Sequence, residues 1–178
     1  ADAVKALVAR RADVRAKEPA RDQTALMTAV AQGHVEVVRV LLAAGSDVRA
    51  RSRVTRALVN RANPNDITAA MVGEVSQGGS TPLLFAARAG DAESVKILVA
   101  AGAKIDEVTT DGMSALKLAT IRGHVPAALQ LLEFGADPNL DGKGYVPLHW
   151  AAGSWETQFT TSDIVTNREG NEEWNALK

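Results

Sequence analysis

Three segments of the sequence share one internal spacing, and this repeat constrains the fold more than any other feature. The segments read TALMTAVAQGHVEVVRVLLAAGSDV from Thr24, TPLLFAARAGDAESVKILVAAGAKI from Thr81 and SALKLATIRGHVPAALQLLEFGADP from Ser114. Each has Leu at its third position, Ala at its sixth and Gly at its tenth. The second and third segments begin 33 residues apart, and a fourth start, VPLHWAA, follows 32 residues later at Val146. We therefore expect a row of similar units, each packing on the next.

Each unit carries the start and stop signals of two short helices. Thr24, Thr81 and Ser114 are hydroxyl residues suited to cap the first helix, and Pro82 and Pro147 follow where a missing N–H is tolerated. The glycine at the tenth position ends the first helix after about two turns. The second helices are predicted over 35–44, 92–101 and 125–134, and their inner faces are supplied by Leu41 and Leu42, Leu98 and Val99, and Leu131 and Leu132.

The composition agrees with a helical stack. Hydrophobic residues make up 46% of the 178 residues and aromatic residues only 4%, which favours helices packed through small side chains over bulky strands. Because helices this short are unstable alone, the core must lie between units. The sequence has no apolar run long enough to cross a membrane. It also has no cysteine, which excludes disulfides, thiolate catalysis and cysteine-ligated zinc.

The motifs TPLLFAA, VPLHWAA and TALMTAV, followed by GH or GD and then by LLAAGSDV, LVAAGAKI or LLEFGADP, resemble the ankyrin repeat. The signature of that repeat is T-P-L-H-x-A at a period of 33. The stretches GGSTPLLFAARAGD and PLHWAAGSWET are more similar to bacterial than to eukaryotic members. The resemblance implies antiparallel helix pairs joined by hairpin-like loops that project at about a right angle. We therefore expect an all-α ankyrin-repeat solenoid of about four to five stacked helix-turn-helix units, incomplete at both ends.

We expect residues 1–178 to form this single solenoid. In chain order its parts are a partial repeat, a repeat, an inserted loop, two further repeats and an atypical, incomplete repeat with an insertion, over 1–16, 17–50, 51–78, 79–108, 109–140 and 141–178. The inserted loop is assigned because Thr24 and Thr81 lie 57 residues apart, 24 more than the period. Since an insertion must leave the stacked helices intact, it is expected between two units.

The inserted segment is rich in arginine. Five arginines lie from Arg49 to Arg61, and a flexible basic loop could meet phosphates or an acidic protein surface. No aromatic residue is interleaved with them, so the stacking platform of single-strand binders is missing. Solvated loop charge is the simpler interpretation. Alternatively, the stretch VTRALVN could form a short strand or a helical turn whose arginines face water.

The resemblance implies that a partner binds at the variable positions before each first helix and at those before the glycine that ends it. We add the inserted loop, because it is where this chain departs from the repeat. The candidate partner-binding residues are Arg21, Gln23, Gln32, Arg51, Arg53, Arg56, Gln77, Ser80, Arg88, Thr110, Met113, Arg122, Lys143, Tyr145 and Trp155. Phe85 and Trp150 are instead expected to pack between repeats, because Thr28 and Leu118 occupy the positions equivalent to Phe85.

No residue pattern points to catalysis. H-E-x-x-H, a phosphate-binding glycine loop and a G-x-S-x-G elbow are all missing from the sequence. The resemblance implies that His34, His124 and His149 pin loops and helix starts. We therefore expect no catalytic, cofactor or metal site. The predicted function is non-catalytic binding of a protein of unknown identity through the concave face and the inserted loop.

Two alternatives remain open. Nucleic-acid binding through the arginines is the less favoured one. The other is a structural or assembly role within a longer repeat protein. Residues 1–61 hold twelve Lys and Arg against six Asp and Glu, and residues 62–178 hold eight against fifteen, so ends of opposite charge could pair between copies. No secretion signal is found in the sequence, and the expected compartment is left open between the cytoplasm and the periplasm or outside.

Overall fold

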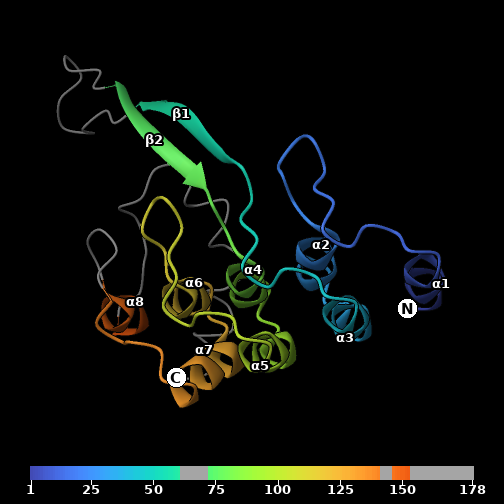
Figure 1. Cartoon of the computed structure of the whole chain (residues 1–178). Helices are drawn as coiled ribbons and strands as arrows, with labels where there is room; N and C mark the ends of the chain where they lie inside the picture. Colours follow the sequence, from blue (N-terminus) through green and yellow to red (C-terminus); the bar gives the residue numbers. More distant parts are fainter. Residues whose placement is uncertain (61–71, 141–145, 153–178) are drawn as a thin grey trace.

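The helices stack in two layers in this computed structural model, which describes residues 1–60, 72–140 and 146–152 (Figure 1). One layer holds the first helices of the units, which are α2 (Ala25–Ala31), α4 (Pro82–Ala89), α6 (Ala115–Ile121) and α8 (Pro147–Ala152). The other holds the second helices, which are α1 (Asp2–Ala9), α3 (Val35–Ala43), α5 (Ala92–Ala100) and α7 (Val125–Glu133). The expected helical solenoid is confirmed.

The helix boundaries follow the local signals. Each predicted second helix starts at the expected residue and ends one residue earlier than expected. Thr24 and Ser114 cap as predicted, since their hydroxyl oxygens accept from the N–H of Met27 at 3.3 Å and of Lys117 at 3.2 Å. The predicted hydroxyl cap at Thr81 is wrong, because Thr81 makes no side-chain cap hydrogen bond. Helix α4 starts there with Pro82 in its first turn, where the fixed φ of proline favours a helix start.

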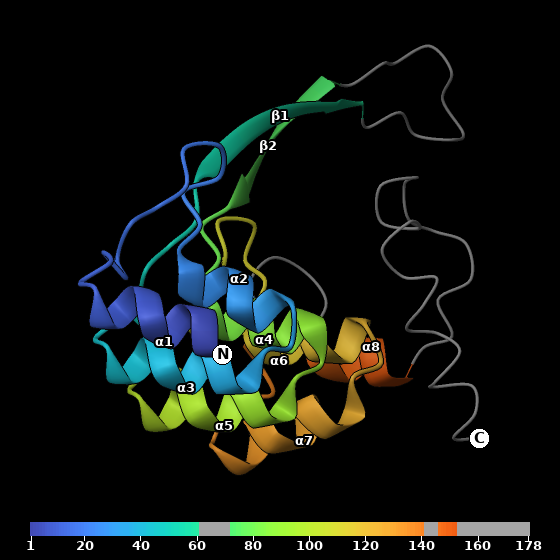
Figure 2. The ribbon, with the colours of Figure 1, turned by 90° about the vertical axis from the view of Figure 1, so that its right-hand side faces the viewer.

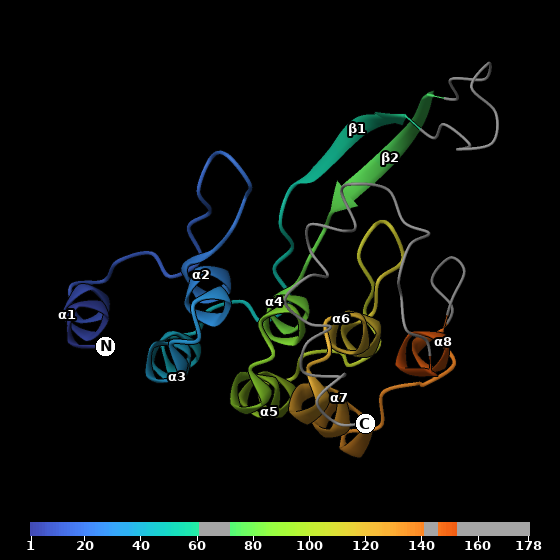
Figure 3. The same cartoon turned by 180° about the vertical axis from the view of Figure 1, so that it is seen from behind.

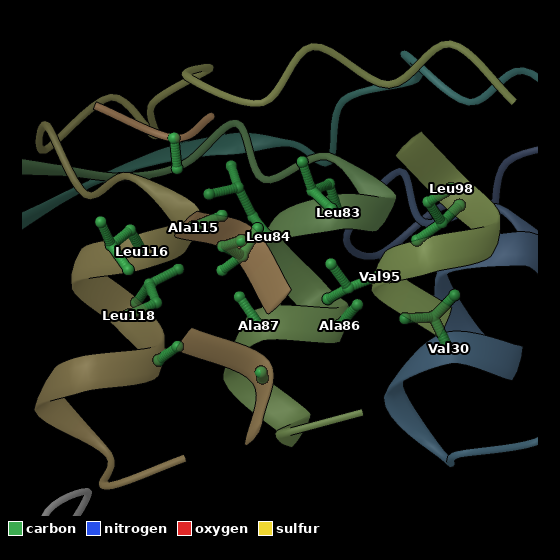
Figure 4. Close-up of a cluster of buried hydrophobic side chains, with 14 of the residues drawn as sticks. Val30, Leu83, Leu84, Ala86, Ala87, Val95, Leu98, Ala115, Leu116 and Leu118 are labelled. Carbon is green, nitrogen blue, oxygen red and sulfur yellow. The ribbon is translucent and has the colours of Figure 1, made fainter. Parts of the chain in front are cut away.

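The core lies between neighbouring units. Side chains of α2, α4, α5 and α6 meet in one cluster, and many of them are alanines, which let the helices approach closely (Figure 4). In the second helices the first residue of each predicted apolar pair is buried, at Leu41, Leu98 and Leu131. The second residue is half-buried in α3 and α5, and at Leu132 of α7 it is 42% exposed. The predicted inner faces are thus correct for the first residue of each pair.

The inserted segment forms a β-hairpin. Strands β1 (Val54–Asn60) and β2 (Val72–Gly78) pair antiparallel, with Val54 opposite Gly78 and Asn60 opposite Val72. This confirms the strand interpretation of VTRALVN and corrects the expectation of a flexible loop; Val54, Thr55 and Val59 are β-branched residues, which favour strands. Figure 2 shows the hairpin rising away from the helical stack. It is a small two-stranded addition to a fold that is otherwise helical where the structure describes it.

Three connections project to the same side of the stack, and we call them fingers (Figure 3). The first finger (17–24) and the short finger (108–114) are each closed by an isolated antiparallel pairing, Lys17 with Thr24 and Val108 with Ser114. The long finger (51–81) contains β1 and β2. At its base the Ser52 N–H donates to the Ser80 carbonyl at 3.0 Å. The hairpin therefore continues a finger that the repeat already provides.

Two of the three histidines make hydrogen bonds of the predicted kind, one to the preceding unit and one at a helix start. The Nε2 of His124 lies 3.1 Å from the carbonyl oxygen of Arg88, in the preceding unit. The Nδ1 of His149 accepts from the Val146 N–H at 3.2 Å, at the start of α8. His34 occupies the position equivalent to His124, but its side chain makes no cap hydrogen bond.

Candidate partner-binding groove

A groove of about 650 Å³ lies where the fingers meet the first helices. All three fingers supply its walls, through Ala20, Arg21, Gln23, Ser52, Arg53, Thr55, Gln77, Gly78, Ser80, Thr109, Asp111 and Met113. The layer of first helices supplies its floor, through Phe85, Arg88, Leu118, Ile121, Arg122 and Trp150. The groove thus runs from the first finger to α8, and the hairpin forms its middle wall.

The floor of the groove is largely apolar. Phe85 of α4, Leu118 and Ile121 of α6 and Trp150 of α8 come from three successive first helices. Leu118 is almost fully buried, while the other three are half-buried. An apolar floor with polar walls is typical of sites that take up part of another molecule.

Arginine dominates the charge of the groove. Four arginines line it, namely Arg21, Arg53, Arg88 and Arg122. One carboxylate, Asp111, also lines it, and the Thr109 hydroxyl donates to that carboxylate. Asp22 is close by and pairs with Arg53 at 3.0 Å and 3.3 Å through both carboxylate oxygens. Positive charge is therefore in excess among the described residues of the groove.

Arg88 is held in place from two directions. Its guanidinium carbon lies 5.8 Å from the centre of the Phe85 ring, within the range of a cation–π contact. Its carbonyl oxygen meets the imidazole of His124 at 3.1 Å. The charged end stays exposed to solvent. The side chain thus lies over the Phe85 ring, and it forms no ion pair with a carboxylate in the described part of the chain.

The hairpin wall is fixed by contacts to both neighbouring fingers. On one side the Arg53 N–H donates to the Arg21 carbonyl at 2.7 Å, and the Arg53 guanidinium pairs with Asp22. On the other side the Thr110 hydroxyl donates to the Gly78 carbonyl at 3.1 Å. The groove therefore has its walls assembled before any partner arrives.

In the first finger, backbone N–H groups converge on Glu18. Its carboxylate accepts from Ala20 at 2.7 Å, from Arg21 at 2.5 Å and from Gln23 at 3.3 Å. Desolvation raises the pKa of Glu18, but these hydrogen bonds and the charge of Arg21 outweigh it and lower the pKa below its ordinary value of 4.5. Glu18 thus orders the part of the first finger that lines the groove.

Eight of the predicted partner-binding residues line the groove, namely Arg21, Gln23, Arg53, Gln77, Ser80, Arg88, Met113 and Arg122. Four lie elsewhere, namely Gln32, Arg51, Arg56 and Thr110. Lys143, Tyr145 and Trp155 fall outside the described residues. A binding role for any of them stays a prediction, although the structure gathers more than half of them at one place.

Arg51 and Thr110 have structural contacts instead. The Arg51 guanidinium donates to the carbonyls of Gly79 at 2.8 Å and Val108 at 3.0 Å, and it lies 3.5 Å from the Glu107 carboxylate. Thr110 joins the short finger to β2, as described above. Both residues hold fingers together, so we leave them out of the candidate binding surface.

The pleat of β1 separates arginines that the sequence presents as one basic run. Arg53 and Thr55 line the groove, whereas Val54 and Arg56 do not. Side chains alternate between the two faces of a strand, so residues of opposite parity point away from each other. Of the remaining arginines in the run, Arg49 donates to the Gly102 carbonyl at 3.5 Å.

Two groove residues were predicted only as packing between repeats. Phe85 packs against the core cluster as expected, but Phe85 and Trp150 are both half-buried and line the groove. The sequence held one signal for this, because the fifth position of the unit varies between Thr28, Phe85 and Leu118. A position that only filled a conserved space would not vary so much in volume.

The described residues show no metal site and no membrane span. No three His, Asp or Glu side chains gather closely enough to hold an ion in that part of the chain. None of the helices described is long and apolar enough to pass through a bilayer.

Comparisons with known proteins agree with the architecture. The family model for Ankyrin repeats (3 copies) matches residues 1–52, 48–141 and 83–165. The ankyrin repeat and KH domain-containing protein mask-1 of Caenorhabditis elegans is 32% identical over 141 residues, which cover 78% of this chain and 4% of that protein. Human SH3 and multiple ankyrin repeat domains protein 1 is 40% identical over 79 residues, which cover 43% and 4%.

A third relative carries the name of an enzyme. Glycerophosphocholine phosphodiesterase gde1 of Schizosaccharomyces pombe is 33% identical over 112 residues, which cover 63% of this chain and 8% of that protein. The chain thus spans less than a tenth of the length of each of these relatives. All three organisms are eukaryotes, and the expected likeness to bacterial members stays a prediction. The family match extends over nearly the whole sequence, and the chain therefore belongs to the ankyrin repeat family.

Proposed function

We propose that this chain is a non-catalytic module that binds a protein partner in the groove between its fingers and first helices. Ankyrin repeats are generally protein–protein interaction modules. The observation that supports this particular surface is the groove itself, in which an apolar floor and three polar fingers converge. Binding sites commonly combine an apolar centre with polar groups that fix orientation.

The fixed hairpin favours this use of the surface. Because Arg53 and Thr110 tie it to both neighbours, the walls need little ordering when a partner binds. Association loses less conformational entropy when side chains are already in place. The long finger also extends the wall beyond the height of the other two fingers (Figure 1). We propose that it widens the contact area while the helices stay unchanged.

We propose no enzymatic activity. The similarity to the phosphodiesterase covers only 8% of that protein and lies in the repeats of this chain. The groove shows no buried carboxylate pair among its described residues, and its acidic lining residue, Asp111, is exposed.

The test removes the hairpin and keeps the finger. Deleting residues 54–76 leaves six residues between Arg51 and Thr81, as many as lie between Lys17 and Thr24 in the first finger. We expect the helical circular dichroism and the thermal midpoint to be largely retained. Capture of the partner identified by cross-linking and mass spectrometry should be lost.

The matched control is Lys96→Ala, on the exposed face of α5 and outside the groove. It should retain both the fold and partner capture. If the deletion variant captured the same partner as the wild type, the hairpin would have no part in binding. If it unfolded, the hairpin would be a structural element.

Assembly with another copy is a second candidate, supported by apolar residues at both ends of the stack. Leu132 of α7 is 42% exposed, and Leu7 of α1 is 60% exposed. Stacking the end of one copy on the start of another would cover them. Light scattering over a range of protein and salt concentrations tests this role. A monomer at every concentration would exclude it.

A further inference from the structure

Building on the function proposed above, we propose that the groove takes an extended acidic peptide segment in which carboxylates flank an apolar side chain. Carboxylates would meet the arginines of the walls and floor, and the apolar side chain would occupy the space above Phe85 and Leu118. The partner is thus defined by chemistry as a protein with an exposed acidic, partly apolar stretch.

Charge complementarity gives the sign of the partner. Four arginines line the groove, one acidic residue, Asp111, lines it as well, and Asp22 pairs with Arg53. Arg88 forms no ion pair with any described carboxylate. A cationic groove attracts carboxylates from a distance and disfavours basic segments.

The geometry of arginine favours carboxylates in particular, beyond the general attraction of its positive charge for negative groups. A guanidinium group presents donors in a planar fork that matches both oxygens of a carboxylate. The Arg53–Asp22 pair shows this geometry within the groove wall, with contacts of 3.0 Å and 3.3 Å. Arg88 is oriented by the Phe85 ring beneath it, so its fork is available on the solvent side.

The apolar floor adds the second requirement. Phe85, Leu118 and Ile121 of the floor line the same groove as the four arginines. A purely acidic chain would leave this surface covered by water, whereas an aliphatic or aromatic side chain would remove it from water. The lining extends from the first finger to α8 across successive units, so the segment must be extended to contact both ends.

Nucleic acid fits the groove less well. A phosphate backbone requires a basic track with few carboxylates, because its affinity comes from neutralised phosphates. Here Asp22 and Asp111 are interspersed with the arginines. One face of Phe85 is already covered by Arg88, which removes a stacking surface for a base.

The experiment selects ligands from a library of random linear peptides displayed on phage, with the full chain as the immobilised target. We expect the selected peptides to be enriched in Asp and Glu on both sides of an apolar residue. The affinity of a labelled selected peptide, measured by fluorescence anisotropy, should fall as salt is added. Arg21→Gln combined with Arg88→Gln should weaken it by about tenfold or more.

Controls locate the site and the charge effect. Lys96→Gln on α5 removes one positive charge away from the groove and should leave the affinity within about twofold of the wild type. Arg88→Lys keeps the charge but not the fork, so it should recover only part of the loss seen with Arg88→Gln. Arg21 and Arg88 are both exposed, so the variants at these two positions are expected to fold.

The outcomes separate this inference from the proposed function. If the selected peptides are neutral or basic and Phe85→Ala weakens them while the arginine variants do not, the groove binds peptides but the acidic-peptide proposal is wrong. If acidic peptides bind the double variant as tightly as the wild type, they bind elsewhere and the proposal is also wrong. If no peptide is enriched, both proposals fail. If duplex DNA displaces a selected peptide at equal concentration, the groove prefers phosphates and the acidic-peptide proposal is overturned.

Discussion

The long finger and the short finger occupy equivalent places in the repeat and differ mainly in length. The short finger closes with Val108 opposite Ser114, and the long finger continues for seven more residue pairs, from Val54 with Gly78 to Asn60 with Val72. The helices on either side stack in the same way, because α2 contacts α4 and α4 contacts α6. The comparison teaches that the length of a finger can change while the helices on either side keep the same stacking.

The largest expected effect comes from the helix that supports both fingers. Leu84 of α4 is 1% exposed, so Leu84→Ala should lower the free energy of unfolding by about 2–5 kcal/mol through lost burial and a cavity. Urea unfolding followed by circular dichroism measures it. Leu129→Ala, at a residue that is 55% exposed, should change it by less than about 0.5 kcal/mol. Equal effects would show that the stack does not carry the stability.

The next effect is specific to the long finger. Gly78 has a φ of +106°, and a Cβ there would lie 2.0 Å from the Arg53 carbonyl oxygen, so Gly78→Ala should strain the hairpin base by about 1–3 kcal/mol. Hydrogen exchange at the Ser52 and Arg53 amides should become faster. Gly102 has a φ of +93° with open space around its Cβ position, so Gly102→Ala provides the control for backbone strain alone. Unchanged exchange in Gly78→Ala would mean that the hairpin base tolerates the added atom.

A smaller effect concerns the contacts between fingers. Arg51→Ala removes the donor to the Gly79 and Val108 carbonyls and should lower stability by about 1 kcal/mol, since the side chain is 45% exposed. Lys17 occupies the equivalent position in the first finger and donates only to the Arg51 carbonyl, at 3.0 Å. Lys17→Ala should therefore lower the thermal midpoint less. The reverse order would contradict the assignment of Arg51 as the stronger contact.

The smallest expected effect is a difference in pH dependence between the first finger and the short finger. Glu18 has a lowered pKa in the folded protein, so its contribution is present above the ordinary value of 4.5 and is lost as pH falls through the folded pKa. At the equivalent place in the short finger, the Met113 N–H donates to the Thr109 hydroxyl at 2.9 Å. A threonine hydroxyl does not titrate, so this contact should not change with pH. The amide NMR shifts of Ala20, Arg21 and Gln23 should follow this acid transition. In Glu18→Gln they should not, and a persisting transition would assign it to another group.

The sequence predicted the helices well because their signals are local. Glycine at the tenth position and a hydroxyl residue at the first act within a single turn, so the second helices were placed to within one residue. The inserted segment was located because Thr24 and Thr81 lie 24 residues further apart than one repeat period. The cap at Thr81 failed because it depends on how the Thr81 side chain packs once the hairpin precedes it, and its hydroxyl is buried without a hydrogen bond among the described residues.

The groove was harder to predict because it is assembled from different units. The predicted finger residues Gln77 and Met113 do line it, since finger position follows from the repeat. The separate roles of Arg51, Arg53 and Arg56 depend on the pleat of β1 and on carbonyls more than twenty residues away. Phe85 was assigned to packing because sequence spacing does not show how far the neighbouring helix covers it.

The basic side chains at equivalent positions of successive repeats reach main-chain carbonyls of the next unit. Arg15 donates to the Gly45 carbonyl at 3.2 Å and Arg49 to that of Gly102 at 3.5 Å, while Lys17 and Arg51 donate to the carbonyls of Arg51 and Val108. Every residue type carries such a carbonyl, so the receiving unit needs no matching side chain. A later unit could be replaced during evolution by one of different sequence, and the earlier unit would still hold it.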